Sequence, residues 1–172
     1  MKRHIVLVGL PGSGKSAVGR LVARELEAPF LDIDRAVTER AGASVAAIFA
    51  ELGEAGFREL EREEAERALG GPAAVVAPGG GWAAQPGNLE AISKSALVVH
   101  LETDPAIAWQ RVAQEGGRPL LEATDPIARM GELERERIGA YRQAAAVVNT
   151  DRLEPREVAR RVVELARSMG GW

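Results

Sequence analysis

A glycine-rich stretch near the start of the chain, GLPGSGKS, carries the residue types best suited to chemistry. Its Gly9, Gly14, Lys15 and Ser16 fit the pattern G-x-x-x-x-G-K-[ST], in which glycines without a Cβ let backbone N–H groups wrap a polyphosphate. The lysine adds positive charge for the outer phosphates, and the serine hydroxyl can ligate the accompanying Mg²⁺. The pattern predicts a phosphate-binding P-loop rather than a glycine-rich turn that only links a strand to a helix.

The elements around this loop have the order that a P-loop requires. Short β-rich runs alternate with longer helical patterns, which predicts one parallel sheet covered on both faces. The expected strands are residues 4–8, 29–31, 73–77, 96–101 and 145–149. The expected helices are residues 16–26, 44–69, 86–93, 104–114, 126–141 and 155–169, the last three with proline in the first turn. Active sites in such sheets gather where the strands end, so the residues that follow each strand are candidates for function.

Two acidic residues follow the second expected strand, Asp32 and Asp34 in FLDIDRAV. Because they lie two residues apart, they can project to the same side of an extended segment. Behind a P-loop, one carboxylate can hold metal charge while the other orients or deprotonates an accepting hydroxyl. The alternative is that these aspartates end the strand and cap the next helix.

The segment IFAELGEAGFRELE places Phe49, Phe57, Arg58 and Glu61 close together near a Gly-Glu break. We interpret them as part of a substrate-binding segment. The alternative is that Arg58 is a solvated helix residue paired with Glu54 or Glu61 at helical spacing, and that the phenylalanines belong to the core.

Three glycines, Gly79 to Gly81, follow the third strand and precede Trp82. Because glycine has no side chain, they leave the backbone accessible for close approach of a ligand, although a flexible turn would use glycines too.

Arginines in two further segments are candidates for contact with anionic groups. Arg111 and Arg118 flank a polar loop in RVAQEGGRPLL that can close over a phosphate and exclude water. Arg137 lies in RERIGAYRQAA on an expected helix. The alternative for the loop with Arg111 and Arg118 is a surface loop without a function. The alternative for Arg137 is a solvated, charged face of a helix.

Composition excludes several classes of function. The 172 residues are 46% hydrophobic, enough for one domain with a full core, and the net charge of −3 lacks the basic excess of a nucleic-acid binder. The absence of cysteine excludes disulfides and thiolate metal sites. We find no separate signal segment before the first strand and no apolar run of membrane-spanning length, and we expect a cytoplasmic protein without a membrane partner.

Taken in order, these motifs resemble those of the shikimate kinase family over essentially the whole chain. The segments that carry the resemblance are GLPGSGKS, LDID, GEAGFRELE, GGG, GGRPLL, RIGAY and NTDRLEP. The resemblance implies a three-layer α/β P-loop kinase fold with a five-stranded parallel sheet in the order 2-3-1-4-5, formed by a single domain over residues 1–172. It also implies a substrate-binding segment near residues 33–61 and a lid near residues 112–124. The implied activity is transfer of the γ-phosphate of ATP to the 3-hydroxyl of shikimate, which gives 3-phosphoshikimate and ADP on the route to chorismate and the aromatic amino acids.

The same resemblance implies a role for each candidate residue. Catalysis would involve Lys15, Asp34 and Arg118, and Mg²⁺ would be held by Ser16 and, through water, Asp32. ATP would be bound by Gly12, Ser13, Gly14, Lys15, Ser16, Ala17, Arg111, Arg118 and Pro155. Shikimate would be bound by Asp34, Phe49, Phe57, Arg58, Glu61, Gly79, Gly80, Gly81 and Arg137. Arg58 and Arg137 would hold its carboxylate, which suits the planar, bidentate guanidinium group. We expect a monomer.

Two positions depart from the usual pattern of the family, Ala47 where aspartate is common and Trp82 where a small residue is common. Neither is assigned to chemistry, although Trp82 raises the question of an altered pocket wall. A different P-loop kinase that acts on a hydroxylated carboxylate, such as a gluconate kinase, is the nearest alternative. A nucleotide-binding switch without transfer activity is disfavoured, because no N-K-x-D-like guanine-reading segment is present.

Overall fold

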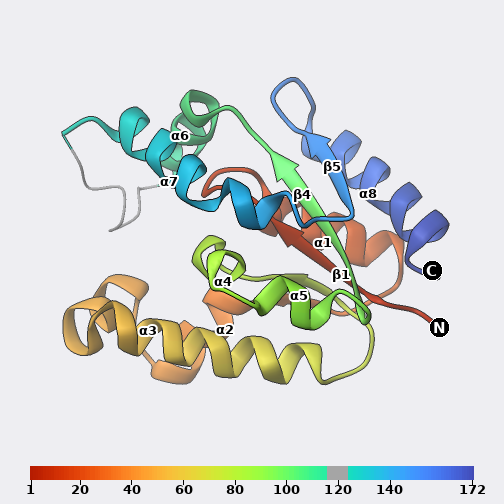
Figure 1. Ribbon diagram of the computed structural model, residues 1–172, viewed down its shortest axis with the longest axis horizontal. Coiled ribbons are helices and arrows are strands. Elements are labelled where there is room, and N and C mark those ends of the chain that lie inside the picture. Colours follow the sequence, from red (N-terminus) through yellow and green to blue (C-terminus); the bar gives the residue numbers. More distant parts are fainter. Residues whose placement is uncertain (116–123) are drawn as a thin grey trace.

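The fold is built on one parallel sheet, seen in a computed structural model that describes residues 1–115 and 124–172 (Figure 1). The strands are β1 His4–Val8, β2 Phe30–Asp32, β3 Val75–Ala77, β4 Ala96–Glu102 and β5 Ala146–Asn149. Their spatial order is β2-β3-β1-β4-β5, and each neighbouring pair is parallel. The predicted fold class and strand order are therefore confirmed.

Helices connect the strands and cover the sheet. They are α1 Lys15–Glu25, α2 Ile33–Ala41, α3 Val45–Leu69, α4 Gly80–Ala84, α5 Asn88–Ile92, α6 Pro105–Gln114, α7 Pro126–Tyr141 and α8 Pro155–Met169. As predicted, α6, α7 and α8 each begin with proline, whose fixed φ suits the first helical position.

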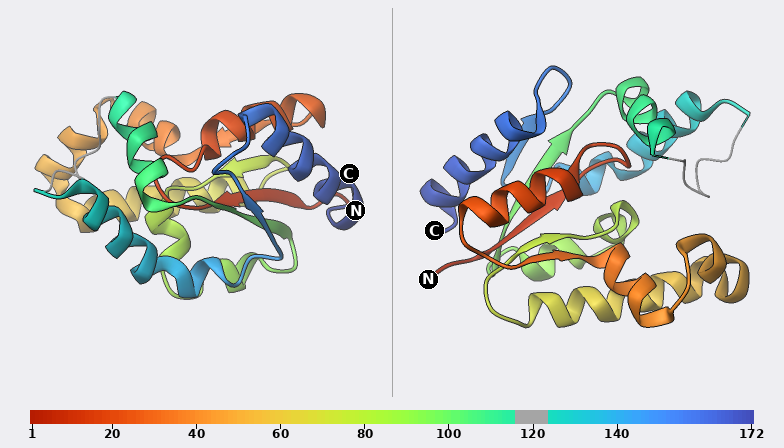
Figure 2. Two further views of the ribbon diagram at one scale, coloured as in Figure 1. Left: turned by 90° about the horizontal axis from the view of Figure 1, so that it is seen from above. Right: turned by 180° about the vertical axis from the view of Figure 1, so that it is seen from behind.

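The side chains of the strands alternate between two apolar layers, one on each face of the sheet. Ile5 and Leu7 of β1 face α1 and α8, whereas Val6 and Val8 face the layer that includes α4, α5 and α7. Figure 2 shows α1 and α8 together on one side of the sheet. This alternation within buried parallel strands produces the three-layer architecture.

Two helices were not predicted, α2 and α4. Helix α2 starts directly at the end of β2 because the Asp32 side chain accepts a hydrogen bond from the backbone N–H of Arg35 and caps the helix. Helix α4 contains two glycines, which have low helix propensity, but Trp82 and Ala83 are buried against the core and hold it in place. Local sequence signals for α4 are therefore weak, and tertiary packing decides its conformation.

The long helix α3 is interrupted where the Gly-Glu break was noted. Gly53 has φ 68° and ψ −178°, a conformation that favours glycine. The interruption separates a short N-terminal part of α3, which carries Phe49, from the long part that carries Arg58 and Glu61. Within the described ranges, no helix combines the length and the apolar character needed to cross a membrane.

Candidate active site

The P-loop connects β1 to α1 at the carboxyl edge of the sheet. Gly12 has φ 80°, and a Cβ at this position would lie 2.2 Å from the carbonyl oxygen of Ala108, so only glycine fits. Gly14, with φ 94°, precedes Lys15, the first residue of the 11-residue helix α1. The Lys15 ammonium donates to the carbonyl oxygens of Gly9 and Leu10, both at 2.8 Å. An anion at the loop would therefore meet the N-terminus of α1 and the positively charged ammonium of Lys15.

A cavity of about 350 Å³ lies on the outer side of the P-loop. It is lined by Gly12, Ser13, Gly14, Lys15, Ser16, Ala17, Val18, Arg111, Gln114, Glu115, Thr150, Leu153, Glu154, Pro155 and Val158. All residues assigned to ATP from the sequence line this cavity, apart from Arg118, which lies outside the described residues. The cavity is large enough for part of a nucleotide and opens onto the phosphate loop.

Arg111 joins the two sides of this cavity. Its guanidinium donates to the carbonyl oxygen of Gly12 at 3.3 Å, and to the hydroxyl and carbonyl oxygens of Thr150 at 3.1 and 3.0 Å. Thr150 was not predicted as a site residue, although it belongs to the NTDRLEP segment. Arg111 therefore links Gly12 of the P-loop to Thr150 in the loop that follows β5.

Ser16 and Asp32 lie side by side, as a shared metal site requires. The Ser16 hydroxyl donates to one Asp32 carboxylate oxygen at 2.6 Å, while the other oxygen caps α2. The capping alternative is thus correct for Asp32, and it does not exclude the contact with the P-loop. Among the described residues, no group of three His, Cys, Asp or Glu side chains could hold a metal. One carboxylate and one hydroxyl beside a phosphate loop suit Mg²⁺, which keeps several waters and takes its other ligands from phosphates.

A second cavity, of about 470 Å³, lies on the inner side of the loop. It is lined by Pro11, Ser16, Asp32, Asp34, Arg35, Thr38, Ser44, Val45, Ala46, Phe49, Phe57, Arg58, Glu61, Gly79, Gly80, Gly81, Leu133 and Arg137. Every residue assigned to shikimate from the sequence is in this set. Ser16 lines both cavities, so a ligand in each would meet at the P-loop.

The sequence argument placed Asp32 and Asp34 on one extended segment, and this geometry is wrong. The strand β2 ends at Asp32, and Asp34 lies in the first turn of α2. Both aspartates still line the inner cavity, because the turn from strand to helix directs them there.

Two arginines form one wall of the inner cavity. Arg58 pairs with Glu61, with 2.8 Å between the guanidinium and the carboxylate, and with the more exposed Glu54 at 3.6 Å. Arg137 of α7 is buried, with 6% of its surface exposed. The alternatives of solvated helix residues are therefore wrong for both arginines, whereas the predicted pairing of Arg58 within α3 is present.

Charged side chains closely approach all three glycines. A Cβ at Gly79 would lie 2.0 Å from a Glu61 carboxylate oxygen, one at Gly80 would lie 2.6 Å from the Arg137 guanidinium, and one at Gly81 would lie 2.2 Å from the Arg58 guanidinium. The glycines serve packing as well as exposure of the backbone, and the flexible-turn alternative is wrong because Gly80 and Gly81 begin α4.

Glu61 is a buried acid in the lining of the cavity. Desolvation raises the pKa of Glu61, the Arg58 guanidinium opposes the rise, and the nearby Asp34 carboxylate adds to it. One Glu61 oxygen, buried, accepts no hydrogen bond from any described residue. The site thus holds a buried carboxylate oxygen beside Gly79 and near Asp34, without a hydrogen bond from the described residues.

The aromatic residues have separate positions. Phe57 is buried, with its ring centroid 4.7 Å from that of Phe49, and both line the inner cavity. Trp82 is buried in the core, and the lining of the cavity does not include it. Ala47 is exposed on the surface of α3. Pro11 and Leu133 line the inner cavity but were not predicted, since an isolated apolar residue carries no sequence signal for a site.

Comparison with known proteins identifies relatives of this chain. A sequence model of the family described as "Shikimate kinase" matches residues 11–167. A shikimate kinase of Symbiobacterium thermophilum is 43% identical over 170 residues, covering 97% of this chain and 98% of the relative. The structure of a shikimate kinase from Acinetobacter baumannii in complex with shikimate superposes with a TM-score of 0.92 at 33% identity, covering 98% of this chain and 94% of the other.

A gluconokinase from Sinorhizobium meliloti has a TM-score of 0.64 at 17% identity, covering 99% of this chain and 94% of the other, a likeness that shows the shared fold alone. The family match, by contrast, runs from Pro11 of the P-loop through the residues of the inner cavity and past the loop that follows β5. The chain belongs to the shikimate kinase family, whose members are ATP-dependent kinases.

Proposed function

We propose that the two cavities divide the reaction of this shikimate kinase, with ATP in the outer cavity and shikimate in the inner one. The observation that carries the proposal is that both cavities meet at Ser16 of the P-loop. A phosphoryl group at the P-loop would therefore face a hydroxyl held in the inner cavity. Transfer from the γ-phosphate of ATP to the 3-hydroxyl of shikimate needs this opposed placement, because the attacking and leaving oxygens are roughly in line.

Arg58 and Arg137 would bind the carboxylate of shikimate. Both are positioned by packing before a ligand arrives, Arg58 by Glu61 and Gly81, and Arg137 by burial against Gly80. A preorganised guanidinium pair binds a carboxylate with less loss of side-chain entropy than two mobile arginines. The proposed substrate-binding segment, residues 33–61, supplies Arg58 but not Arg137.

Asp34 would bind the substrate hydroxyls and orient the accepting one. Its carboxylate lies in the first turn of α2 and lines the inner cavity near Glu61 and Gly79. General-base assistance typically contributes about 10²–10⁴-fold, and the fall in turnover of Asp34→Asn would measure how much of it this step uses.

Mg²⁺ would be held by Ser16 directly and by Asp32 through water. When bound, the ion neutralises charge on the phosphates of ATP. Lys15 would bind the outer phosphates, and Arg118, in the proposed lid of residues 112–124, would contact the transferring group. We also propose a monomer, because a single chain provides both cavities, and a cytoplasmic location, as expected from the sequence. Size-exclusion chromatography with light scattering tests the oligomeric state.

ADP release measured with ATP and Mg²⁺, with and without shikimate, tests the function. We expect release to depend on shikimate, and gluconate to replace it poorly. Release at the same rate with either acid, or without any acceptor, would contradict the proposal. Asp34→Asn tests the proposed role of Asp34 directly: ATP binding should persist while transfer falls, and unchanged turnover would remove Asp34 from the mechanism.

A further inference from the structure

Two neighbouring helices, α2 and α3, carry residues that line the inner cavity. Asp34 lies in the first turn of α2, and Arg58 and Glu61 lie on the long part of α3. The helices are joined by a short connection that begins at Gly42, which has φ 63°. The distance between Asp34 and the α3 residues Arg58 and Glu61 depends on how α2 packs against α3.

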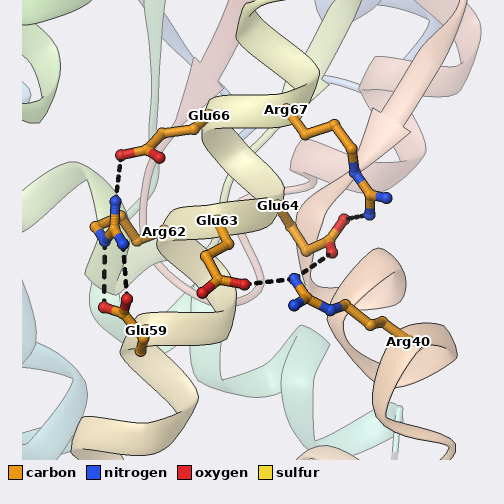
Figure 3. Close-up of polar contacts among 7 residues, drawn as sticks. All are labelled: Arg40, Glu59, Arg62, Glu63, Glu64, Glu66 and Arg67. Atoms are coloured by element: carbon orange, nitrogen blue, oxygen red, sulfur yellow. Dashed lines mark hydrogen bonds and ion pairs between the residues drawn. The ribbon is translucent and has the colours of Figure 1, made fainter.

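An arginine in the last turn of α2 forms a polar bridge to α3 (Figure 3). The Arg40 guanidinium lies 2.6 Å from a carboxylate oxygen of Glu63 and 3.1 Å from one of Glu64. Figure 3 shows Arg40 reaching across from its own helix to these two neighbouring glutamates. We call these three residues, Arg40, Glu63 and Glu64, the interhelix clamp.

The glutamates of the clamp differ in their surroundings. The Glu64 side chain is only 2% exposed and also accepts a hydrogen bond from Arg67 of its own helix. Glu63 is partly exposed and pairs with Arg40. A nearly buried carboxylate must be paired, so Glu64 provides a fixed anchor for Arg40 rather than a mobile surface contact. Hydrogen bonds from Arg67 and Arg40 accordingly lower the pKa of Glu64 despite its burial.

The clamp lies close to the cavity along both helices. Arg40 is six residues from Asp34, about 9 Å along α2, and Glu64 is three residues from Glu61, about 4.5 Å along α3. At the cavity end, burial is the main cause of the raised pKa of Glu61, and the Asp34 carboxylate adds a smaller rise that the Arg58 guanidinium opposes. At the clamp end, the opposite charges of Arg40 and the two glutamates attract, so the clamp links α2 to α3 beside the residues that line the cavity.

We infer that Arg40 is a positioning residue for shikimate, which sets the spacing between Asp34 and the Arg58–Glu61 pair by clamping α2 to α3. The inference rests on the proposed placement of shikimate in the inner cavity. Apolar packing of Ile33 and Val37 also holds α2 to the core. The clamp is thus expected to adjust the geometry of the site more than the stability of the fold.

The test compares Arg40→Gln with a matched control, Arg62→Gln. Arg62 also pairs with two glutamates, Glu59 at 2.6 Å and Glu66 at 2.5 Å, but both lie on α3, so this cluster joins nothing to α2. The two arginines are equally exposed, at 46% and 47%. Each variant therefore loses two ion pairs of an equally exposed arginine, but the partners of Arg62 are exposed, whereas Glu64 is nearly buried and keeps its hydrogen bond from Arg67 in R40Q. Only R40Q loses a link between helices.

For R40Q we expect KM for shikimate to rise about fivefold, the equivalent of about 1 kcal/mol, with KM for ATP within about 1.5-fold of wild type. Calorimetric titration with shikimate in the absence of ATP should show the same loss of affinity. R62Q should leave both KM values unchanged, and the melting temperatures of R40Q and R62Q should agree within a few degrees. Arg40→Lys should recover part of the shikimate affinity, because an ammonium can still pair with Glu63.

The inference is overturned if KM for shikimate is the same in R40Q and R62Q, or if R40Q lowers kcat alone, as a smaller folded fraction would. It is equally overturned if R40K has the full defect of R40Q. Should R40Q fail to fold, Glu63→Gln provides the test from α3, and unchanged shikimate affinity in that variant would again refute the clamp. Wild-type protein that releases no ADP with shikimate would refute the proposed function itself, whereas normal wild-type turnover with an unaffected R40Q refutes only the clamp.

Discussion

A single methyl group added at Gly81 should displace Arg58 and so weaken the binding of shikimate. In Gly81→Ala, the new Cβ would lie 2.2 to 2.3 Å from three atoms of the Arg58 guanidinium, where ordinary contacts begin near 3.4 Å. The guanidinium, or the backbone of α4, must therefore move by about 1 Å. Because Arg58 is held by Glu61 and lies near the Phe57 ring, it cannot move without changing its direction toward the cavity.

The size of the effect follows from what a displaced guanidinium loses. Removal of one partner from a buried charge pair costs about 2–5 kcal/mol, which is an upper limit for a group that moves but is still present. We expect about 1.4–2.8 kcal/mol, a rise of about 10- to 100-fold in KM for shikimate. Because Arg58 would hold the carboxylate equally in the ground state and the transition state, kcat should change little.

Steady-state kinetics with saturating ATP and varied shikimate, followed by the converse, measures both KM values of the Gly81→Ala variant. Gly139→Ala is the control, because a Cβ at Gly139 of α7 has nothing within 4 Å and should stabilise the helix by up to about 1 kcal/mol without changing kinetics. The melting temperature of Gly81→Ala checks that the fold survives. If the variant keeps a shikimate KM within about twofold of wild type, either Arg58 does not bind the carboxylate or Gly81 does not limit its position.

Further expected outcomes concern the nucleotide side of the site and its buried acid. Lys15→Ala should lower kcat by more than about tenfold, since the ammonium would stabilise charge on the outer phosphates. A folded variant that keeps more than about a tenth of the wild-type turnover would contradict this role. Arg111→Gln should raise KM for ATP but not for shikimate, because it releases Gly12 from Thr150, and steady-state kinetics with each substrate varied measures both effects. Glu61→Gln should flatten the dependence of stability on pH. Burial raises the pKa of Glu61 above its ordinary value of 4.5. In the wild type its contribution is therefore complete below about pH 4.5 and is lost as the pH rises through the folded-state pKa. Urea unfolding of both proteins from pH 4 to 8 should give a difference in unfolding free energy that grows with pH in favour of Glu61→Gln, and a constant difference would show that Glu61 does not titrate in this way.

Several features were predictable from the sequence because the residues that determine them are neighbours in the chain. The P-loop needs glycines, a lysine and a serine within one short stretch between a strand and a helix, and all of them are visible in GLPGSGKS. The alternation of strands and helices predicted the sheet, and the resemblance supplied the strand order that the structure confirms. The P-loop part of the outer cavity follows from these local signals, whereas Arg111 and Pro155 were assigned by the resemblance. The contact of Thr150 with Arg111, which was not predicted, depends on how β5 ends.

The inner cavity was decided by tertiary structure. From the sequence, Arg58 and Arg137 could equally have been solvated helix residues, because the pattern of charges along a helix does not reveal what packs on it. Arg58 is partly buried and lies against Gly81, and Arg137 is almost completely buried and lies against Gly80. Both glycines come from a different part of the chain and leave room for the guanidinium groups. Whether a charged side chain is buried or solvated is determined by contacts between segments distant in sequence, and the energetic cost of burying it depends on the partners that only the folded chain brings together.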